Sequence, residues 1–177
     1  MNLGKIYLES IQNQFRSYKK LGDRTFAQLT QEELNHIPAV GSNSIAVIIK
    51  HMHGNLLSRF TNFLTEDGEK PWRQREEEFT AVEALSKDSL LQVWEEGWNC
   101  LFRTLDQLEP DDLTKTVTIR TEPHSALDAI NRQLAHHASH VGQIVYLGKM
   151  YRENDWQSLS IPKGGSASFN EKIAGKS

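Results

Sequence analysis

Three histidines stand within five positions of the segment RQLAHHASHVGQIV, residues 132–145, whose pattern predicts a helix. His136 and His140 are four residues apart, so on a helix their side chains lie one turn apart on the same face. Two imidazoles in this arrangement can both bind one metal ion, at about 2.0–2.1 Å from each nitrogen. His137 is rotated by about 100° from His136 and falls on the apolar stripe of the helix. We therefore expect a metal-binding pair, with His137 at the edge of the core.

A third ligand must come from another element, because two histidines alone make a weak metal site. The segment KHMHGN offers His51 and His53, which point to nearly opposite sides of a helix. His53 lies nearer to the apolar stripe of that helix, whereas His51 shares its side with small or polar residues such as Ser44 and Asn55. A metal site needs room for a substrate and polar groups that orient its ligands. This favours His51.

The spacing alone leaves a second interpretation open, because a histidine pair four residues apart also occurs on ordinary amphipathic helices. The motif is not that of a metalloprotease, in which a glutamate directly follows the first ligand; here that position is His137. The sequence has no glycine-rich phosphate loop and no Gly-x-Ser-x-Gly motif. Cys100 lies in a periodic apolar segment and is expected to be a buried structural thiol. His36 and His124 lie beside loop or cap signals and are expected at the surface.

The composition narrows the class of protein. The chain has 177 residues, of which 38% are hydrophobic and 24% charged, as in a single soluble globular domain. The net charge of −3 gives no basic surface for a nucleic-acid partner. The longest aliphatic run, IAVII at 45–49, is far shorter than the roughly 20 residues that span a bilayer. The single cysteine suits a reducing compartment. We expect a cytoplasmic protein that binds neither nucleic acid nor membrane.

Four long amphipathic segments must position the histidines. Their apolar residues recur at steps of three and four, which predicts helices over residues 2–21, 44–64, 87–108 and about 125–151. Gly22 follows the first pattern and is expected to end that helix. A Thr-x-x-Glu motif at Thr30–Glu33 predicts a short helix start, and a Ser-x-x-Asp motif at Ser125–Asp128 predicts the start of the last long helix.

These segments predict an all-α fold, a four-helix bundle. The connection between the second and third long helices has about 20 residues, enough to return along a helix about 30 Å long. Those two helices can therefore be parallel, joined by a long crossover. Alternating β-branched residues near 115–120 predict a short β segment or an extended connection. We expect the bundle to occupy residues 1–156, and the Gly/Ser-rich residues 157–177 to form a tail packed on or draped over it.

The segment AINRQLAHHASHVGQIVYLGK resembles the final helix of the DinB-like superfamily, a group of small metal-binding four-helix-bundle proteins of bacteria. The second helix, NSIAVIIKHMHGNLLSRF, is also similar to that superfamily, and the loop TEDGEKPWRQREEEF and tail SLSIPKGGSASFN resemble one uncharacterised branch of it. The resemblance covers nearly the whole chain. It implies one ligand seven residues after the Ser or Thr that opens the second helix, and two from the last helix. Carried over, the ligands are His51, His136 and His140, with Ser44 opening the second helix. Many members have an arginine where Val141 stands, which alters the charge of the pocket.

Characterised relatives in that superfamily include transferases that join thiols such as bacillithiol or mycothiol to electrophiles. The resemblance implies a divalent ion, a small-molecule thiol or electrophile as partner, a role in stress or detoxification, and a homodimer. Zn and Ni are both compatible with three nitrogen ligands and are the expected ions. A thiol coordinated to such an ion is deprotonated and becomes a nucleophile. Arg73 in the loop, Lys163 in the tail and Asn55 beside His51 are candidates for binding the substrate. Two other functions stay open: a metal-dependent hydrolase and a non-catalytic metal-binding protein.

Overall fold

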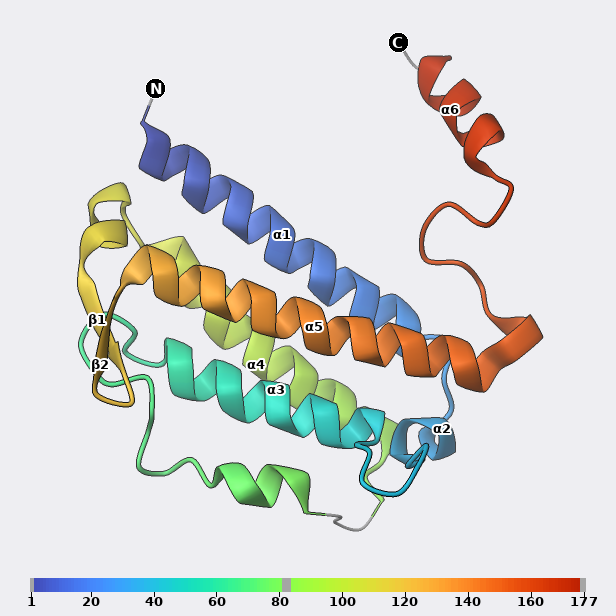
Figure 1. Ribbon diagram of the computed structural model, residues 1–177, viewed down its shortest axis with the longest axis horizontal. Helices are drawn as coiled ribbons and strands as arrows, with labels where there is room; N and C mark the ends of the chain where they lie inside the picture. Colours follow the sequence, from blue (N-terminus) through green and yellow to red (C-terminus); the bar gives the residue numbers. More distant parts are fainter. Residues whose placement is uncertain (1, 81–83, 176–177) are drawn as a thin grey trace.

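The computed structural model describes residues 2–80 and 84–175. Four long helices lie side by side in it: α1 (Leu3–Phe26), α3 (Ile45–Phe60), α4 (Lys87–Gln107) and α5 (Ala126–Arg152) (Figure 1). Helices α3 and α4 pack against each other and run in the same direction. Helices α1 and α5 also pack against each other, and both run in the direction opposite to that of α3 and α4 (Figure 1). The all-α bundle with a long crossover between parallel helices is confirmed.

Serine side chains fix where three of these helices begin. The hydroxyls of Ser44, Ser86 and Ser125 each accept a hydrogen bond from a backbone N–H three residues later, at the starts of α3, α4 and α5. The predicted cap at Ser125 is therefore confirmed. The Thr30–Glu33 motif forms a reciprocal capping box at the start of the short helix α2 (Gln31–Asn35), as predicted.

Gly22 does not end the first helix, and that prediction was wrong. Helix α1 continues to Phe26, with Gly22 buried inside it. A Cβ atom at this position would lie 2.5 Å from a ring carbon of Trp94, so the glycine allows α1 to approach the indole on α4. The indole Nε1 donates a hydrogen bond to Asp23 at 2.8 Å, which fixes the same contact. The glycine serves helix packing here.

The core lies between the four long helices. Its largest fully buried side chains are aromatic and meet edge to face: Phe15 with Trp98, Phe26 with Trp94, and the two tryptophans with each other. Cys100 is buried beside this core, as expected, with a free thiol. Within the described ranges, no helix combines the length and the apolar character that crossing a membrane requires.

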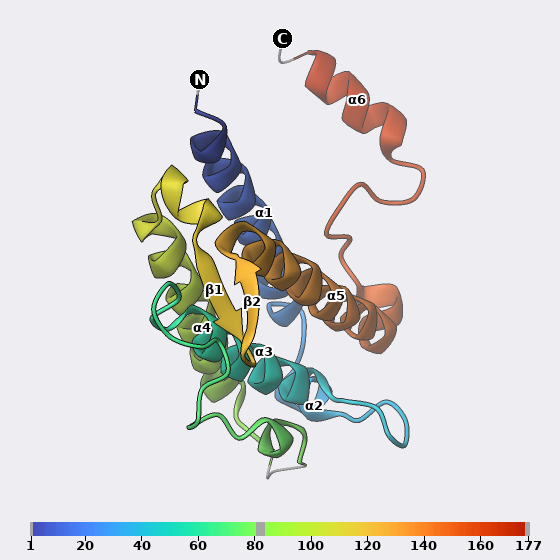
Figure 2. The ribbon, with the colours of Figure 1, turned by 60° about the vertical axis from the view of Figure 1, so that its left-hand side comes forward.

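A small β-hairpin stands at one end of the bundle (Figures 1 and 2). After the 3-10 turn η2 (Pro110–Thr114), strand β1 (Thr116–Ile119) pairs antiparallel with β2 (Glu122–Ser125), with Ile119 opposite Glu122. The predicted β segment near 115–120 is confirmed. Strand β2 was not predicted, because its sequence EPHS has no alternating apolar pattern.

The crossover between α3 and α4 runs back along the side of α3 (Figure 1). It contains the 3-10 turn η1 (Arg75–Phe79), which contacts α3. The crossover therefore brings residues of the predicted loop, including Arg73 and Glu78, against the helix that carries His51.

The C-terminal segment follows α5 and the turn η3 (Glu153–Asp155). Its first residues contact the end of α1: Gln28 exchanges hydrogen bonds with the backbone of Gln157, and Arg24 donates to the carbonyl of Leu159. Residues 157–177 were predicted as a tail packed on or draped over the bundle, and they contain a helix that was not predicted, α6 (Ser166–Ala174). None of its residues is buried, and it stands away from the bundle (Figures 1 and 2).

Candidate metal centre

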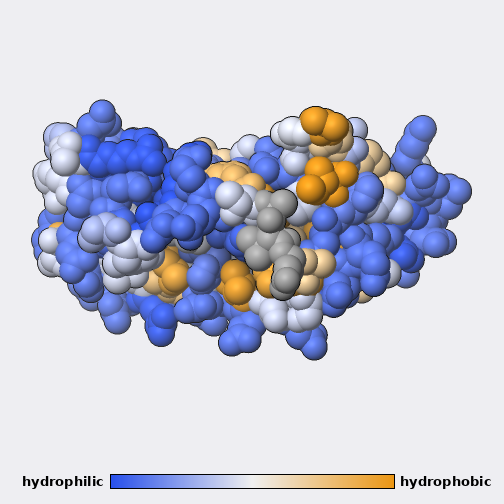
Figure 3. Space-filling view, turned by 90° about the horizontal axis from the view of Figure 1, so that it is seen from below, coloured by the Kyte–Doolittle hydropathy of each residue, from blue (hydrophilic) through white to orange (hydrophobic). Residues whose placement is uncertain are grey.

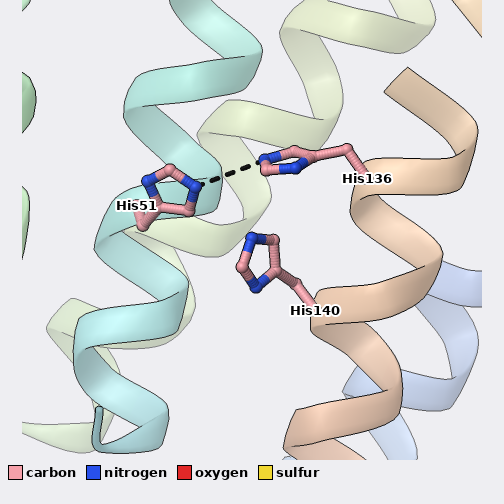
Figure 4. Close-up of side chains that lie close together, drawn as sticks. All are labelled: His51, His136 and His140. Carbon is pink, nitrogen blue, oxygen red and sulfur yellow. Dashed lines mark hydrogen bonds between the residues drawn. The ribbon is translucent and has the colours of Figure 1, made fainter. Parts of the chain in front are cut away.

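The three histidines predicted as metal ligands meet between two helices. His51 projects from α3, and His136 and His140 project from consecutive turns of α5 (Figure 4). One ligand nitrogen of each lies within 4.8 Å of the others, and the Nε2 atoms of His51 and His136 are 3.2 Å apart. Two nitrogens that share a tetrahedral ion at about 2.0–2.1 Å would lie about 3.3 Å apart. The cluster could therefore hold a metal ion.

Hydrogen bonds on the outer side of two rings direct their other nitrogens toward the interior of the cluster. Nδ1 of His51 lies 2.9 Å from a carboxylate oxygen of Glu78, and Nδ1 of His140 lies 3.0 Å from the side-chain oxygen of Gln143. Both oxygens accept, so Nδ1 carries the proton and the lone pair is on Nε2. This is the arrangement that orients histidine ligands in metal sites.

Glu78 is itself held by Arg73. Nε and Nη2 of Arg73 donate to the two carboxylate oxygens at 2.8 and 3.0 Å, a paired contact of high geometric specificity. Burial raises the pKa of Glu78, but the hydrogen bonds from His51 and Arg73 outweigh it, so the pKa is lowered and the carboxylate stays charged. Gly54 on α3 provides the space, because a Cβ atom there would overlap the Glu78 carboxylate.

His136 and His140 are neutral at pH 7, as metal ligands must be. Burial, followed by repulsion from His140, His51 and nearby arginines, lowers the pKa of His136 to about 4. Burial also lowers the pKa of His140, against the opposing hydrogen bond to Gln143.

The remaining histidines lie outside the cluster. His137 is fully buried in the core next to Trp98, deeper than the edge position expected from sequence, and burial lowers its pKa strongly. His53 contacts Glu96 of α4. His36 is exposed, as expected, whereas His124 is half-buried and contacts Asp128 and Arg132, partners that sequence analysis did not identify.

A cavity of about 620 Å³ opens beside the three histidines. Asn55, a predicted substrate-binding residue, lines it together with Gln133; both side chains are buried and their oxygens have no hydrogen-bond partner in the described part of the chain. Arg73 also lines it, but its guanidinium is engaged with Glu78. Lys163 does not: it is exposed in the tail beyond α5.

Four further arginines line the cavity and were missed by sequence analysis. They come from α3, the crossover, the hairpin and α5, and no motif connects them: Arg59, Arg75, Arg120 and Arg132. Only the fold brings them together.

Comparison with known proteins identifies one family. Residues 2–165 match the model of a family described as protein of unknown function (DUF1572). Among solved structures, the fold is similar to the crystal structure of a conserved protein from Enterococcus faecalis, with a TM-score of 0.58 and 18% identity over 85% of this chain and 97% of that one. At this identity the likeness concerns the fold alone. No curated protein gives a significant match.

Proposed function

The chain belongs to the DUF1572 family, and we propose that it is a divalent-metal-binding protein of the DinB-like superfamily that acts as a metal-dependent thiol S-transferase. The observation that carries the proposal is the convergence of three histidines beside an open cavity of about 620 Å³. The crossover bundle and the order of the sequence motifs support the superfamily assignment.

The donor set fits a metal such as Zn or Ni, for which neutral imidazole is a suitable ligand. His51, His136 and His140 would hold the ion, and an ion bound there would supply Lewis acidity that favours the deprotonated form of a thiol substrate. In the described residues no fourth His, Cys, Asp or Glu joins the group. Three protein ligands are typical of catalytic sites, whereas structural zinc sites are closed by four.

The chain's own residues would perform the other tasks of the reaction. Glu78, held by Arg73, orients the His51 ring through Nδ1. The buried oxygens of Asn55 and Gln133 can accept hydrogen bonds from a substrate in the cavity. The walls of the cavity hold the thiol and its electrophilic partner close together, which favours their reaction over encounter in solution.

The test is to load the protein with Zn or Ni, measure the bound metal, and follow the consumption of a small thiol in the presence of a generic electrophile. His140→Ala should lose both metal and rate, and His53→Ala, which changes a histidine of α3 outside the cluster, should lose neither. A rate that equals the uncatalysed background in the loaded protein would reject the transferase. Ester turnover without a thiol would then favour the hydrolase, and retained metal without either reaction would favour a non-catalytic role.

Two further expectations belong to this proposal: the composition and single cysteine predict that the protein acts in the cytoplasm, and the resemblance implies that it acts as a homodimer. Sedimentation equilibrium of the full chain tests the second, with a mass of twice 20.2 kDa as the expected result.

A further inference from the structure

The charged side chains that line the cavity beside the histidines are mostly cationic, although the chain as a whole carries a net charge of −3. Of the charged side chains that line it, one is acidic, Glu122, and the others are five arginines: Arg59, Arg73, Arg75, Arg120 and Arg132. The face of the molecule seen in Figure 3 is largely hydrophilic toward the end that carries the hairpin. A concentration of one charge in a cavity attracts ligands of the opposite charge.

Two of the five arginines are engaged in contacts within the protein. Arg73 holds Glu78 behind His51. Arg59 is buried, where it donates to the carbonyl of Gly68 and pairs with Glu69 at 3.2 Å. Glu69 also accepts from Nε of Arg120 at 2.9 Å, so one carboxylate is shared by two guanidinium groups. The positive charge around Glu69 is therefore not neutralised by it.

The other three arginines keep guanidinium N–H groups that can donate hydrogen bonds to a ligand. Arg120 has 59% of its side chain exposed, and Nε alone engages the shared Glu69. Arg75 pairs with the highly exposed Glu76 and lies over the ring of Phe79, with its own side chain 46% exposed. Arg132 donates one N–H to His124 and has no carboxylate partner among residues 2–80 and 84–175. A ligand in the cavity can therefore meet guanidinium groups from three different elements.

The backbone around Arg120 is held in an unusual conformation. Arg120 and Thr121 form the turn of the hairpin with φ of 55° and 66°, in the left-handed region that favours glycine. The carboxylate of Asp67 accepts hydrogen bonds from both of their N–H groups, at 2.9 and 2.8 Å, and from the N–H of Glu69. Asp67 thus fastens the hairpin turn to the crossover. Such strain persists where the surrounding structure enforces it, and here it fixes the base of an arginine that lines the cavity.

We propose that this cavity is an oxyanion-binding site for a small molecule with carboxylate or phosphate groups, held by Arg75, Arg120 and Arg132 beside the three histidines. The inference rests on the proposed function and deepens it, because it states that the substrate is anionic. Guanidinium groups match carboxylate and phosphate through paired hydrogen bonds. The volume lies within the usual range for small-molecule sites.

The test is calorimetric titration of the full-length protein with succinate and with inorganic phosphate at low ionic strength, which distinguishes a carboxylate site from a phosphate site. Arg120→Gln and Arg132→Gln should each weaken binding of the preferred anion about tenfold, the loss of one charge-assisted hydrogen bond. Arg103→Gln is the matched control, because Arg103 is exposed on α4 and donates to the carbonyl of Asn99 in its own helix. Succinamide, a neutral analogue of succinate, should not bind.

The same titration is repeated after metal has been removed with the neutral chelator phenanthroline. Binding of the anion to a metal ion then cannot contribute to the measured affinity. Binding that persists and depends on Arg132 supports the inference even if the protein shows no transferase activity. If neither anion binds, or if both arginine variants bind like the control, the inference is wrong, and the metal and thiol-transfer assays remain a separate test of the proposed function. Arg132 is exposed, so its variant is expected to fold even if that of Arg120 does not.

Discussion

Glu78 accepts a hydrogen bond from Nδ1 of His51 at 2.9 Å, and both side chains are buried although they come from different elements, the crossover and α3. The contact links the long connection of the bundle to its candidate metal centre. The crossover therefore does more than cover the bundle, because its Glu78 carboxylate determines which nitrogen of His51 faces the other two histidines.

The first prediction concerns this contact. Glu78→Gln removes the charged acceptor but keeps the shape of the side chain, and we expect it to lower the affinity for Zn about 10- to 100-fold, the usual effect of losing a carboxylate behind a histidine ligand. Competition with a chromophoric chelator measures the affinity. Glu77→Gln is the control, because Glu77 is the exposed neighbour in the same turn. Equal affinities of the two variants would show that Glu78 does not support the site.

The second prediction compares two glycines, one packed against a side chain and one facing open space. Gly54→Ala would push a methyl group into the Glu78 carboxylate, and we expect the free energy of unfolding to fall by about 1–3 kcal/mol, with weaker Zn binding as well. Gly142→Ala places its methyl group in open space on α5 and should raise the free energy of unfolding by up to about 1 kcal/mol, because alanine favours helix. Urea denaturation measures both. The same sign for the two variants would contradict the packing described around Glu78.

Sequence patterns were sufficient for the four helices, the caps at Ser125 and Thr30, and the grouping of the three histidines. Those features depend on periodicity within one segment and on a family resemblance that spans the chain. Gly22 was misread because its role is set by Trp94, 72 positions away, and a local rule for helix ends contains no information about that partner.

Four of the five arginines that line the cavity, all except Arg73, were not predicted, for the same reason. The hairpin and the crossover bring Arg120 and Arg75 to the same cavity as Arg132 of α5, and neither connection has a sequence pattern that fixes where it lies. Of the three predicted substrate-binding residues, two line the cavity and one does not. Asn55 lines it, Arg73 lines it while bound to Glu78, and Lys163 lies outside it. Residues of loops and tails were placed least well, because their position depends on packing rather than on periodicity.

The third prediction is a pH dependence of the metal-free protein. The pKa of His136 is about 4 in the folded chain and near 6.5 when unfolded, so between these values the unfolded chain binds a proton that the folded chain does not. Stability is therefore full above pH 6.5 and falls as the pH is lowered toward 4. The lowered pKa values of His137 and His140 act in the same direction. Urea denaturation at pH 7 and pH 5 measures the loss, which should be smaller in His136→Gln. A loss of the same size in that variant would contradict the prediction.

The last prediction concerns Asp67, which joins the hairpin turn to the crossover. Asp67→Ala leaves the N–H groups of Glu69, Arg120 and Thr121 without their acceptor, while the turn keeps two non-glycine residues at positive φ. We expect a loss of about 1–3 kcal/mol in the free energy of unfolding and weaker anion binding in the cavity, because Arg120 is no longer held there. Asp67→Asn, which retains one oxygen acceptor, should lie between the wild type and the alanine variant. If Asp67→Ala lowers stability but binds the anion as tightly as the wild type, Arg120 does not need the turn to reach the ligand, and the strained backbone has no part in binding.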